Sequence, residues 1–187
     1  MKTLLLYIIT LFIFTGCSVK YDHVTLSEDS RVKLTKEDLQ TKQKIETLAQ
    51  MIQSLSPKIN KIEAYNIAQN SIYYSMHLAN SYDLVKPPSF QNFLVNQNLR
   101  QRGLCHQWAS DILDYLKKDK YETIGIYKVI SNEGDYFTEH HAISITARGE
   151  PYDKGIVLDA WRNSGDLYFA YVTQDKEYKW YHRKRVQ

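Results

Sequence analysis

The stretch TIGIYKVI, at residues 123–130, is the first of four β-rich runs in the second half of the chain. The others are HHAISIT (140–146), GIVLDAW (155–161) and LYFAYVT (167–173), and turns containing Gly, Asp or Asn separate them. Short runs of β-branched and aromatic residues between such turns predict an antiparallel sheet. Upstream, residues 35–116 carry apolar residues at helical spacing. Helices followed by strands predict an α+β fold in which N-terminal helices pack on an antiparallel β-sheet.

Several signals divide the helical half of the chain. A capping-box pattern at Thr35 and Asp38 predicts the start of the first helix. The Ser-Pro pair at residues 56–57 separates it from a second helix, and the Pro-Pro pair at 87–88 precedes a short third one. A fourth helix is expected to begin near Cys105, which lies three, four and seven residues before apolar positions of that helix. Cys105 is therefore expected on the inward face of the first turn.

The composition excludes several classes of protein. The chain has 187 residues, which fits one domain, and 43% of them are apolar, which excludes wholesale disorder. Its 24 basic and 21 acidic residues are too nearly balanced for a dedicated nucleic-acid binder. Two cysteines do not make a disulfide framework. Nothing in the sequence calls for a nucleotide, flavin or haem cofactor.

The N-terminus has the pattern of a targeting segment. Met1-Lys2 gives a positive start, and a nearly unbroken apolar run spans Leu4–Phe14. A bilayer span needs about 20 apolar residues, whereas this run has the length of a signal-peptide core. The small residues of Thr15-Gly16-Cys17 then resemble the lipobox of bacterial lipoproteins.

The lipobox resemblance implies cleavage between Gly16 and Cys17 and acylation of Cys17, so that lipid chains hold the protein on a membrane. In that family, Ser18 after the cysteine favours transport to the outer membrane of a cell that has two membranes. A plain signal peptide and an uncleaved anchor helix are the alternatives. The expected organisation is a signal peptide at 1–16, a lipidated N-terminus and flexible tether at 17–34, and one domain at 35–187.

Cys105 has the position that an acyl-transfer nucleophile needs. The thiolate is the reactive form, and the free N–H groups and dipole of a helix N-terminus favour its negative charge. A base must lie nearby, and His140 and His141 fall on a predicted strand, where successive side chains face opposite sides. His141 shares its face with the apolar Ile143 and Ile145, which makes it the inner histidine. We therefore predict His141 as the base, with His140 in reserve.

An imidazole base needs an acceptor that orients it, and Asp159 is the candidate. It lies within an apolar run at 156–161, where a carboxylate is costly unless it is paired. A neighbouring strand that carries His141 would supply the partner. The predicted catalytic residues are thus Cys105, His141 and Asp159, in that chain order.

These segments together resemble the transglutaminase-like superfamily, whose core is papain-like. Gly103-Leu104-Cys105, with Ala109 four residues after the cysteine, is similar to its nucleophile segment. His141-Ala142 is similar to its histidine strand, and Leu158-Asp159 to its aspartate strand. The resemblance covers roughly residues 103–161. It implies a nucleophilic cysteine at a helix N-terminus, with His and Asp on adjacent antiparallel strands.

The oxyanion of an acyl transfer needs donors in addition to backbone amides. The side-chain candidates are Gln101, Asn98 and Gln107, and the sequence does not choose among them. Zinc ligation is a separate alternative, because cysteine and histidine both suit zinc. Its ligands would be Cys105, His106, His140 and His141. That spacing matches no zinc-finger pattern, so we expect no metal.

The expected function is that of a membrane-anchored cysteine hydrolase or acyltransferase that acts on amide or peptide bonds. A location in the cell envelope suggests a protein or a peptidoglycan peptide as substrate. Because the superfamily includes inactive members, the alternative is an inactive envelope lipoprotein that serves as a binding or scaffold module. The expected partners are the membrane and an envelope peptide or protein, and not nucleic acid.

Overall fold

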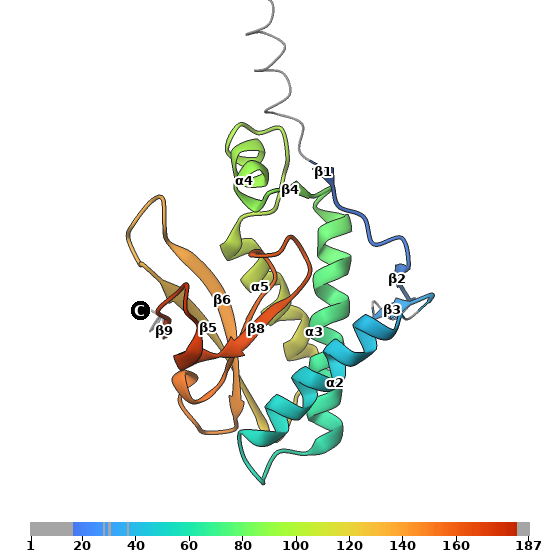
Figure 1. Cartoon of the computed structure of the whole chain (residues 1–187), viewed down its shortest axis with the longest axis vertical. Helices are drawn as coiled ribbons and strands as arrows, with labels where there is room; N and C mark the ends of the chain where they lie inside the picture. Colours follow the sequence, from blue (N-terminus) through green and yellow to red (C-terminus); the bar gives the residue numbers. More distant parts are fainter. Residues whose placement is uncertain (1–16, 28, 30, 37, 183–187) are drawn as a thin grey trace, which may run out of the picture.

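The computed structural model describes residues 17–27, 29, 31–36 and 38–182, and the predicted signal peptide at 1–16 lies outside these residues. The described chain is α+β, with four α-helices and antiparallel sheets, as the order of helical and β-rich segments predicts (Figure 1). The helices are α2 (Leu39–Ser54), α3 (Lys61–Ser81), α4 (Pro88–Asn96) and α5 (Cys105–Leu116). Short 3-10 turns span Lys117–Asp119, Tyr152–Lys154 and Val172–Gln174.

A five-stranded antiparallel sheet forms the second half of the domain. Its strands are β5 (Ile124–Ser131), β6 (His140–Ala147), β7 (Ile156–Asp159), β8 (Tyr168–Tyr171) and β9 (Tyr181–His182). Their spatial order is β8-β7-β6-β5-β9, so that β6 is the central strand, and α5 lies against it. The first four strands coincide with the four β-rich runs of the sequence, whereas β9 is an addition.

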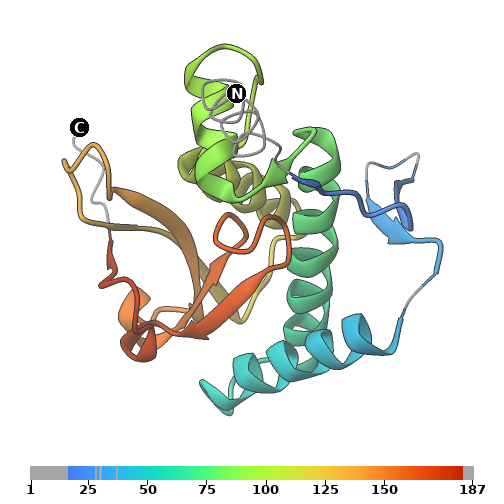
Figure 2. The same cartoon turned by 45° about the horizontal axis from the view of Figure 1, so that its top comes forward.

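Both faces of this sheet are covered, and they hold different residues. On one face, Ile143 of β6 and Leu158 of β7 belong to the main core, which the helices share. Figure 2 shows the helices gathered on one side of the sheet. On the other face, Ala142 and Val157 pack with Trp180 from the C-terminal segment. Every residue of β6 is therefore buried, whichever way it points.

Two helices begin later than the sequence pattern indicates. Asp38 is the N-cap of α2, because its side chain accepts a hydrogen bond from the N–H group of Thr41 at 2.7 Å. Asn60 caps α3 in the same way by accepting from two N–H groups of its first turn. A side chain that reaches the second or third amide marks the start of a helix. Thr35 therefore lies before α2 and is not its cap, and the Ser-Pro pair at 56–57 lies before the start of α3.

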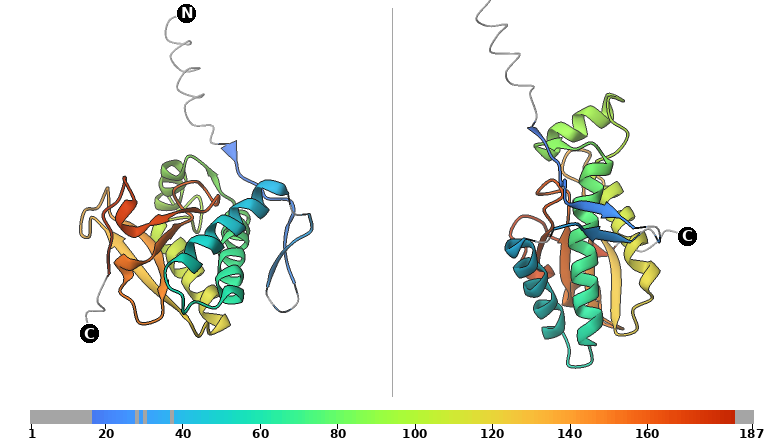
Figure 3. Two further views of the ribbon diagram at one scale, coloured as in Figure 1. Left: turned by 60° about the horizontal axis from the view of Figure 1, so that its bottom comes forward. Right: turned by 90° about the vertical axis from the view of Figure 1, so that its right-hand side faces the viewer.

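The segment at 17–34, which the sequence predicts as a flexible tether, is packed on the domain where the structure describes it. Val24 and Val32 are buried in the main core, and the Val32 N–H group donates to the Tyr115 hydroxyl at 3.1 Å. The tether prediction is wrong because strands of two or three residues are too short to give a detectable period. Figure 3 shows the segment running along α3. Its strands are β1 (Cys17–Ser18), paired with β4 (Val85–Lys86), and β2 (Val24–Leu26), paired with β3 (Val32–Leu34).

Candidate active site

The predicted nucleophile lies at the start of a helix, as the sequence indicates. Cys105 is the first residue of α5 and is half-buried. The residue before it, Leu104, is the N-cap and provides no side-chain hydrogen bond, so the first amides of α5 have no acceptor within the helix. These N–H groups and the helix dipole favour negative charge beside Cys105. The thiol donates to the carbonyl oxygen of Glu139, with 3.8 Å between sulfur and oxygen.

Two glutamine side chains fix the turn before Cys105. Gln107 reaches back from α5, and its Oε1 atom accepts the N–H group of Gly103 at 2.8 Å. Gln91 is fully buried under the same turn and donates to the carbonyl oxygen of Arg102 at 2.8 Å. Gly103 has φ +137°, and a Cβ atom there would lie 2.5 Å from Cγ of Gln91. Glycine is therefore the residue that this turn accepts, and Gly103 helps to position the nucleophile.

The structure pairs Asp159 with His140 and not with His141. The Nε2 atom of His140 lies 2.7 Å from the Oδ2 atom of Asp159, and these residues are only 2% and 1% exposed. The sequence-based choice of His141 as the partner of Asp159 is therefore wrong. The histidine held in reserve occupies that position.

The strand register explains this correction. Ile143 of β6 pairs with Leu158 of β7, so Asp159 points to the face of the sheet opposite to Leu158. His140 points to that same face, whereas His141 shares the face of Ile143. The alternation of apolar residues along this strand predicts that His140 lies on the outer face of the sheet. In the structure the C-terminal segment covers that face, and the histidine that points there is buried with the carboxylate.

Aromatic rings surround the imidazole of His140. Burial alone would lower the pKa of His140, but the hydrogen bonds with Asp159 and Cys105 outweigh this effect and raise the pKa to about 9. The faces of the surrounding rings also favour a cation. The raised pKa favours the charged form of the imidazole. The distances from the ring centroid of His140 to those of Tyr178, Trp161 and Trp180 are 4.4, 4.9 and 5.5 Å.

His140 links the thiol to the carboxylate. Its interaction with Cys105 is among the causes of its raised pKa. Because Nε2 is engaged by Asp159, Nδ1 is the nitrogen left to face the sulfur. The structure thus brings Cys105, His140 and Asp159 into one chain of contacts, supplied by α5, β6 and β7.

A buried ionic network holds Asp159 in place. Its Oδ1 atom accepts the backbone N–H groups of Trp161 and Arg162 at 3.1 and 3.2 Å. Its Oδ2 atom accepts from Nε of Arg162 at 3.1 Å. The other guanidinium nitrogens of Arg162 donate to both carboxylate oxygens of Asp175, at 3.1 and 2.7 Å. Trp180 donates to the same carboxylate at 2.9 Å, so a ring that covers the imidazole also belongs to the network.

Within the network, the charges of Arg162 and Asp175 stabilise each other. Burial opposes the charge of both Asp175 and Arg162, but their ion pair lowers the pKa of Asp175 and raises the pKa of Arg162. Arg162, Asp175 and Trp180 are not predicted as site residues from the sequence, and Asp175 and Trp180 lie beyond the last β-rich run. The one available signal was an acidic residue in an apolar strand, Asp159, followed three residues later by an arginine.

His141 points to the opposite side of β6 and lines the cleft beside Cys105. Its Nε2 atom lies 3.0 Å from Oε1 of Glu139, and its Nδ1 atom is buried with no hydrogen-bond partner in the described chain. Burial lowers the pKa of His141, although the hydrogen bond with Glu139 opposes this shift. We assign the neutral ring a proton on Nε2, because that atom faces a carboxylate. His141 therefore differs from His140 in the direction of its pKa shift as well as in position.

Cys105 lines an open cleft of about 820 Å³. Ligand sites in proteins are typically about 300–1,000 Å³. One wall is α4 and its C-cap, and the other is the turn at 132–139 between β5 and β6. Among the described residues that line the cleft, Glu139 is the single acidic one, and there is no lysine or arginine. The α4 wall presents the carboxamides of Asn92, Asn96 and Gln97, and the turn presents Tyr136 and Phe137.

The three predicted oxyanion donors do not line this cleft. Gln107 is turned toward the residues before α5, and Asn98 and Gln101 are exposed outside the cleft. Asn92 lines the cleft instead, and its Oδ1 atom accepts from Nε1 of Trp161 at 3.0 Å. This bond fixes the carboxamide and leaves its NH₂ group to other partners. Because Trp161 is one of the rings around the imidazole, Asn92 is tied to the candidate site.

The structure separates the residues of the zinc alternative. His140 and His141 point to opposite faces of β6, and the ring centroid of His106 lies 6.1 Å from that of His141. Across the residues that the structure describes, no group of three or more His, Cys, Asp or Glu side chains could hold a metal ion.

Neither a search for membrane-spanning helices nor a comparison with known proteins identifies the function of this chain. Among the described residues, no helix combines the length and the apolar character that a membrane crossing requires. No protein-family model matches the chain, and no curated protein or solved structure matches it with significance. The function must therefore follow from the site itself.

Proposed function

We propose that the protein is a membrane-anchored cysteine hydrolase or acyltransferase with a transglutaminase-like (papain-like) core. The observation that carries the proposal is the chain of contacts from the Cys105 thiol through His140 to Asp159. A helix start and two adjacent antiparallel strands supply these residues, which is the arrangement that the resemblance implies. Attachment to the membrane is supported by the lipobox-like Thr15-Gly16-Cys17, whose cysteine is exposed.

The charged imidazole of His140 prepares the nucleophile. In the reactive form, the thiol proton resides on His140, and a thiolate lies beside an imidazolium. Asp159 stabilises the imidazolium and fixes the orientation of its ring through Nε2. The surrounding aromatic rings exclude water, which strengthens the attraction between the charges.

The thiolate then attacks the carbonyl carbon of an amide bound in the cleft, and the carbonyl oxygen takes the electron pair. Backbone N–H groups at the start of α5 and the NH₂ group of Asn92 are the donors for this oxyanion. His140 gives its proton to the amine nitrogen as the C–N bond breaks, which leaves a thioester on Cys105. Water or a second amine, deprotonated by His140, releases the acyl group.

The lining of the cleft favours a peptide-like substrate. The carboxamides of Asn96 and Gln97 both donate and accept hydrogen bonds, as a peptide backbone does. The carboxylate of Glu139 is engaged by His141, so the cleft offers little charge to a substrate. An uncharged segment of an envelope polypeptide or of a peptidoglycan peptide meets these requirements.

Acetylation by p-nitrophenyl acetate tests this function on the full chain. We expect Cys105 to be acetylated with a burst of p-nitrophenol, while Cys17, exposed in the same unlipidated chain, reacts as an ordinary thiol. Continued release after the burst would indicate hydrolysis, and acceleration by an added amine would indicate transfer. Equal reactivity of the two thiols would contradict the proposal and favour an inactive binding or scaffold module.

A further inference from the structure

Exposed apolar side chains gather around the mouth of the cleft. Phe93, Tyr136 and Phe137 line the cleft and are 47%, 85% and 90% exposed. Leu99, just beyond α4, is 62% exposed. Single exposed apolar residues are ordinary, but a group of them at one place indicates a contact surface. We name Phe93, Tyr136 and Phe137 the apolar rim.

Cys17 is held close to α4, which forms part of the rim. β1 pairs with β4, and the Val19 N–H group donates to the carbonyl oxygen of Leu84 at 2.9 Å. Asn80, at the end of α3, accepts from the Tyr21 N–H group at 2.8 Å and donates to the Tyr21 carbonyl oxygen at 2.9 Å. β4 leads almost directly into α4, so the chain has little slack between Cys17 and that helix. Figures 1 and 3 show β1 beside α4 at the same end of the molecule.

The sequence places a membrane attachment at this point. The apolar run ends at Phe14, three residues before Cys17. Whether that run remains in the membrane or acyl chains on Cys17 replace it, the bilayer surface begins here. α4 has 9 residues and is therefore about 13 Å long, so its part of the rim lies close to the attachment.

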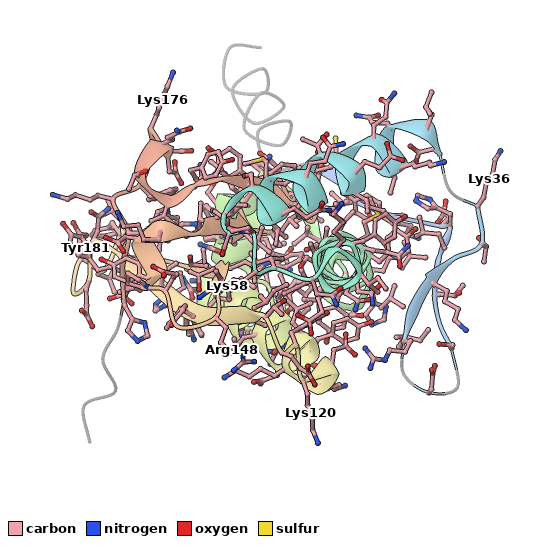
Figure 4. The ribbon with its side chains drawn as sticks, turned by 90° about the horizontal axis from the view of Figure 1, so that it is seen from below. Lys36, Lys58, Lys120, Arg148, Lys176 and Tyr181 are labelled. Atoms are coloured by element: carbon pink, nitrogen blue, oxygen red, sulfur yellow. The ribbon has the colours of Figure 1, made fainter. Side chains whose placement is uncertain are left out.

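The opposite end of the molecule has a different character. Figure 4 views the molecule from below, and the labelled side chains there include Lys58, Lys120 and Arg148. Lys58 precedes α3, whose far end binds Tyr21 near the attachment. Lys58 therefore lies at the end of α3 that is away from the attachment.

We infer that the apolar rim docks on the bilayer and that the cleft opens against the membrane surface. The inference rests on the proposed lipid anchor at Cys17. Aromatic side chains such as those of Tyr136 and Phe137 are suited to the lipid–water interface. The turn that carries them also holds Glu133 and Asp135, so the attraction is apolar and not electrostatic. A polypeptide attached to the same membrane would then reach Cys105 along the surface.

Spin-label accessibility tests this docking on the lipidated full chain in phosphatidylcholine vesicles. Nitroxides are attached to Phe137→Cys and to Ile62→Cys, each in a Cys105→Ser background. Ile62 is the matched control, because it is apolar and 70% exposed but lies in the first turn of α3. The length of that helix, 21 residues or about 30 Å, separates it from Asn80. We expect collisions with a water-soluble nickel chelate to be at least about fivefold rarer at position 137 than at position 62.

The outcomes separate the inference from the proposed function. Equal nickel accessibility at both positions, in protein that floats with the vesicles, would overturn the inference and leave the catalytic proposal intact, because Cys105 takes no part. Protein that does not float would overturn the lipid anchor and the inference with it. Protection that appears only when phosphatidylglycerol is added would overturn apolar docking. A label at Tyr136→Cys gives a second rim position, and circular dichroism confirms that each variant is folded.

Discussion

The Nε2 atom of His140 lies 2.7 Å from the Oδ2 atom of Asp159, and neither side chain is more than 3% exposed. A buried pair of this kind needs further partners, because each charge loses its hydration. Arg162 supplies one partner to the carboxylate, and aromatic rings enclose the imidazole. Because the same imidazole contacts Cys105, the pair of His140 and Asp159 is placed to activate the thiol.

The charged imidazole predicts a loss of stability at alkaline pH. The pKa of His140 is raised to about 9 in the folded protein, against about 6.5 for an unfolded histidine. A raised pKa contributes stability that is fully present below about pH 6.5 and is lost as the pH rises through about 9. Across this window we expect the free energy of unfolding of the wild type, relative to His140→Gln, to fall by up to about 3 kcal/mol. Urea unfolding of both proteins measures this. Parallel pH profiles would mean that the folded imidazole is uncharged.

Arg162→Ala is predicted to be strongly destabilising. The substitution leaves the carboxylate of Asp175 buried without its cation and removes one of the two cationic partners of Asp159, which costs about 3–5 kcal/mol of unfolding free energy. Arg162→Lys should recover only part of this loss, because an ammonium group lacks the planar fork that binds a carboxylate at two points. The control is Arg100→Ala, which removes a more exposed ion pair with Asp83 and should cost less than about 1 kcal/mol. Similar losses for Arg162→Ala and Arg100→Ala would contradict the network.

Gly103→Ala is predicted to disturb the start of α5. The new Cβ atom would lie 2.5 Å from Cγ of Gln91, at a φ of +137°. We expect a loss of about 1–3 kcal/mol of stability and slower acetylation of Cys105. Gly149→Ala is the matched control, because Gly149 has φ +88° but no atom within 4 Å of a Cβ. Thermal unfolding and the acetylation rate compare the two variants. If both lose the same stability, the contact with Gln91 is not the cause.

Asn92→Ala is predicted to slow acylation of Cys105 without weakening substrate binding. An oxyanion donor acts on the transition state, and loss of one donor lowers kcat by about 10²–10³-fold. Asn96→Ala, on the same wall of the cleft, should change the rate by less than about threefold. The concentration dependence of acetylation separates kcat from KM. An increase in KM alone for Asn92→Ala would make this residue a binding contact and not an oxyanion donor.

The sequence predicts the larger elements because their signals are local. The four β-rich runs coincide with β5 to β8, and Cys105 begins α5 as its apolar spacing indicates. The segment that holds Val24 and Val32 gave no such signal, because its strands span only three residues each. Its docking depends on a surface of α3 that lies far away in the sequence.

To predict the partner of Asp159 from the sequence, the alignment of two strands must be considered together. Each strand shows its own alternation, but the register between β6 and β7 decides which residues share a face. If the apolar faces of both strands are matched, Ile143 meets Leu158, and the carboxylate falls on the face of His140. The sequence did not predict that the C-terminal segment covers this face of the sheet. Trp180, which packs there, lies beyond the last β-rich run.

Alkylation of Cys105 by iodoacetamide near neutral pH tests most directly whether His140, and not His141, activates the thiol. Mass spectrometry resolves the rate at Cys105 in the wild type, in His140→Ala and in His141→Ala. Because an adjacent imidazolium stabilises the thiolate, we predict that His140→Ala slows alkylation at least about tenfold, whereas His141→Ala changes it by less than about twofold. Equal rates in all three proteins, or a larger loss in His141→Ala, would contradict the assignment of His140 as the partner of the nucleophile.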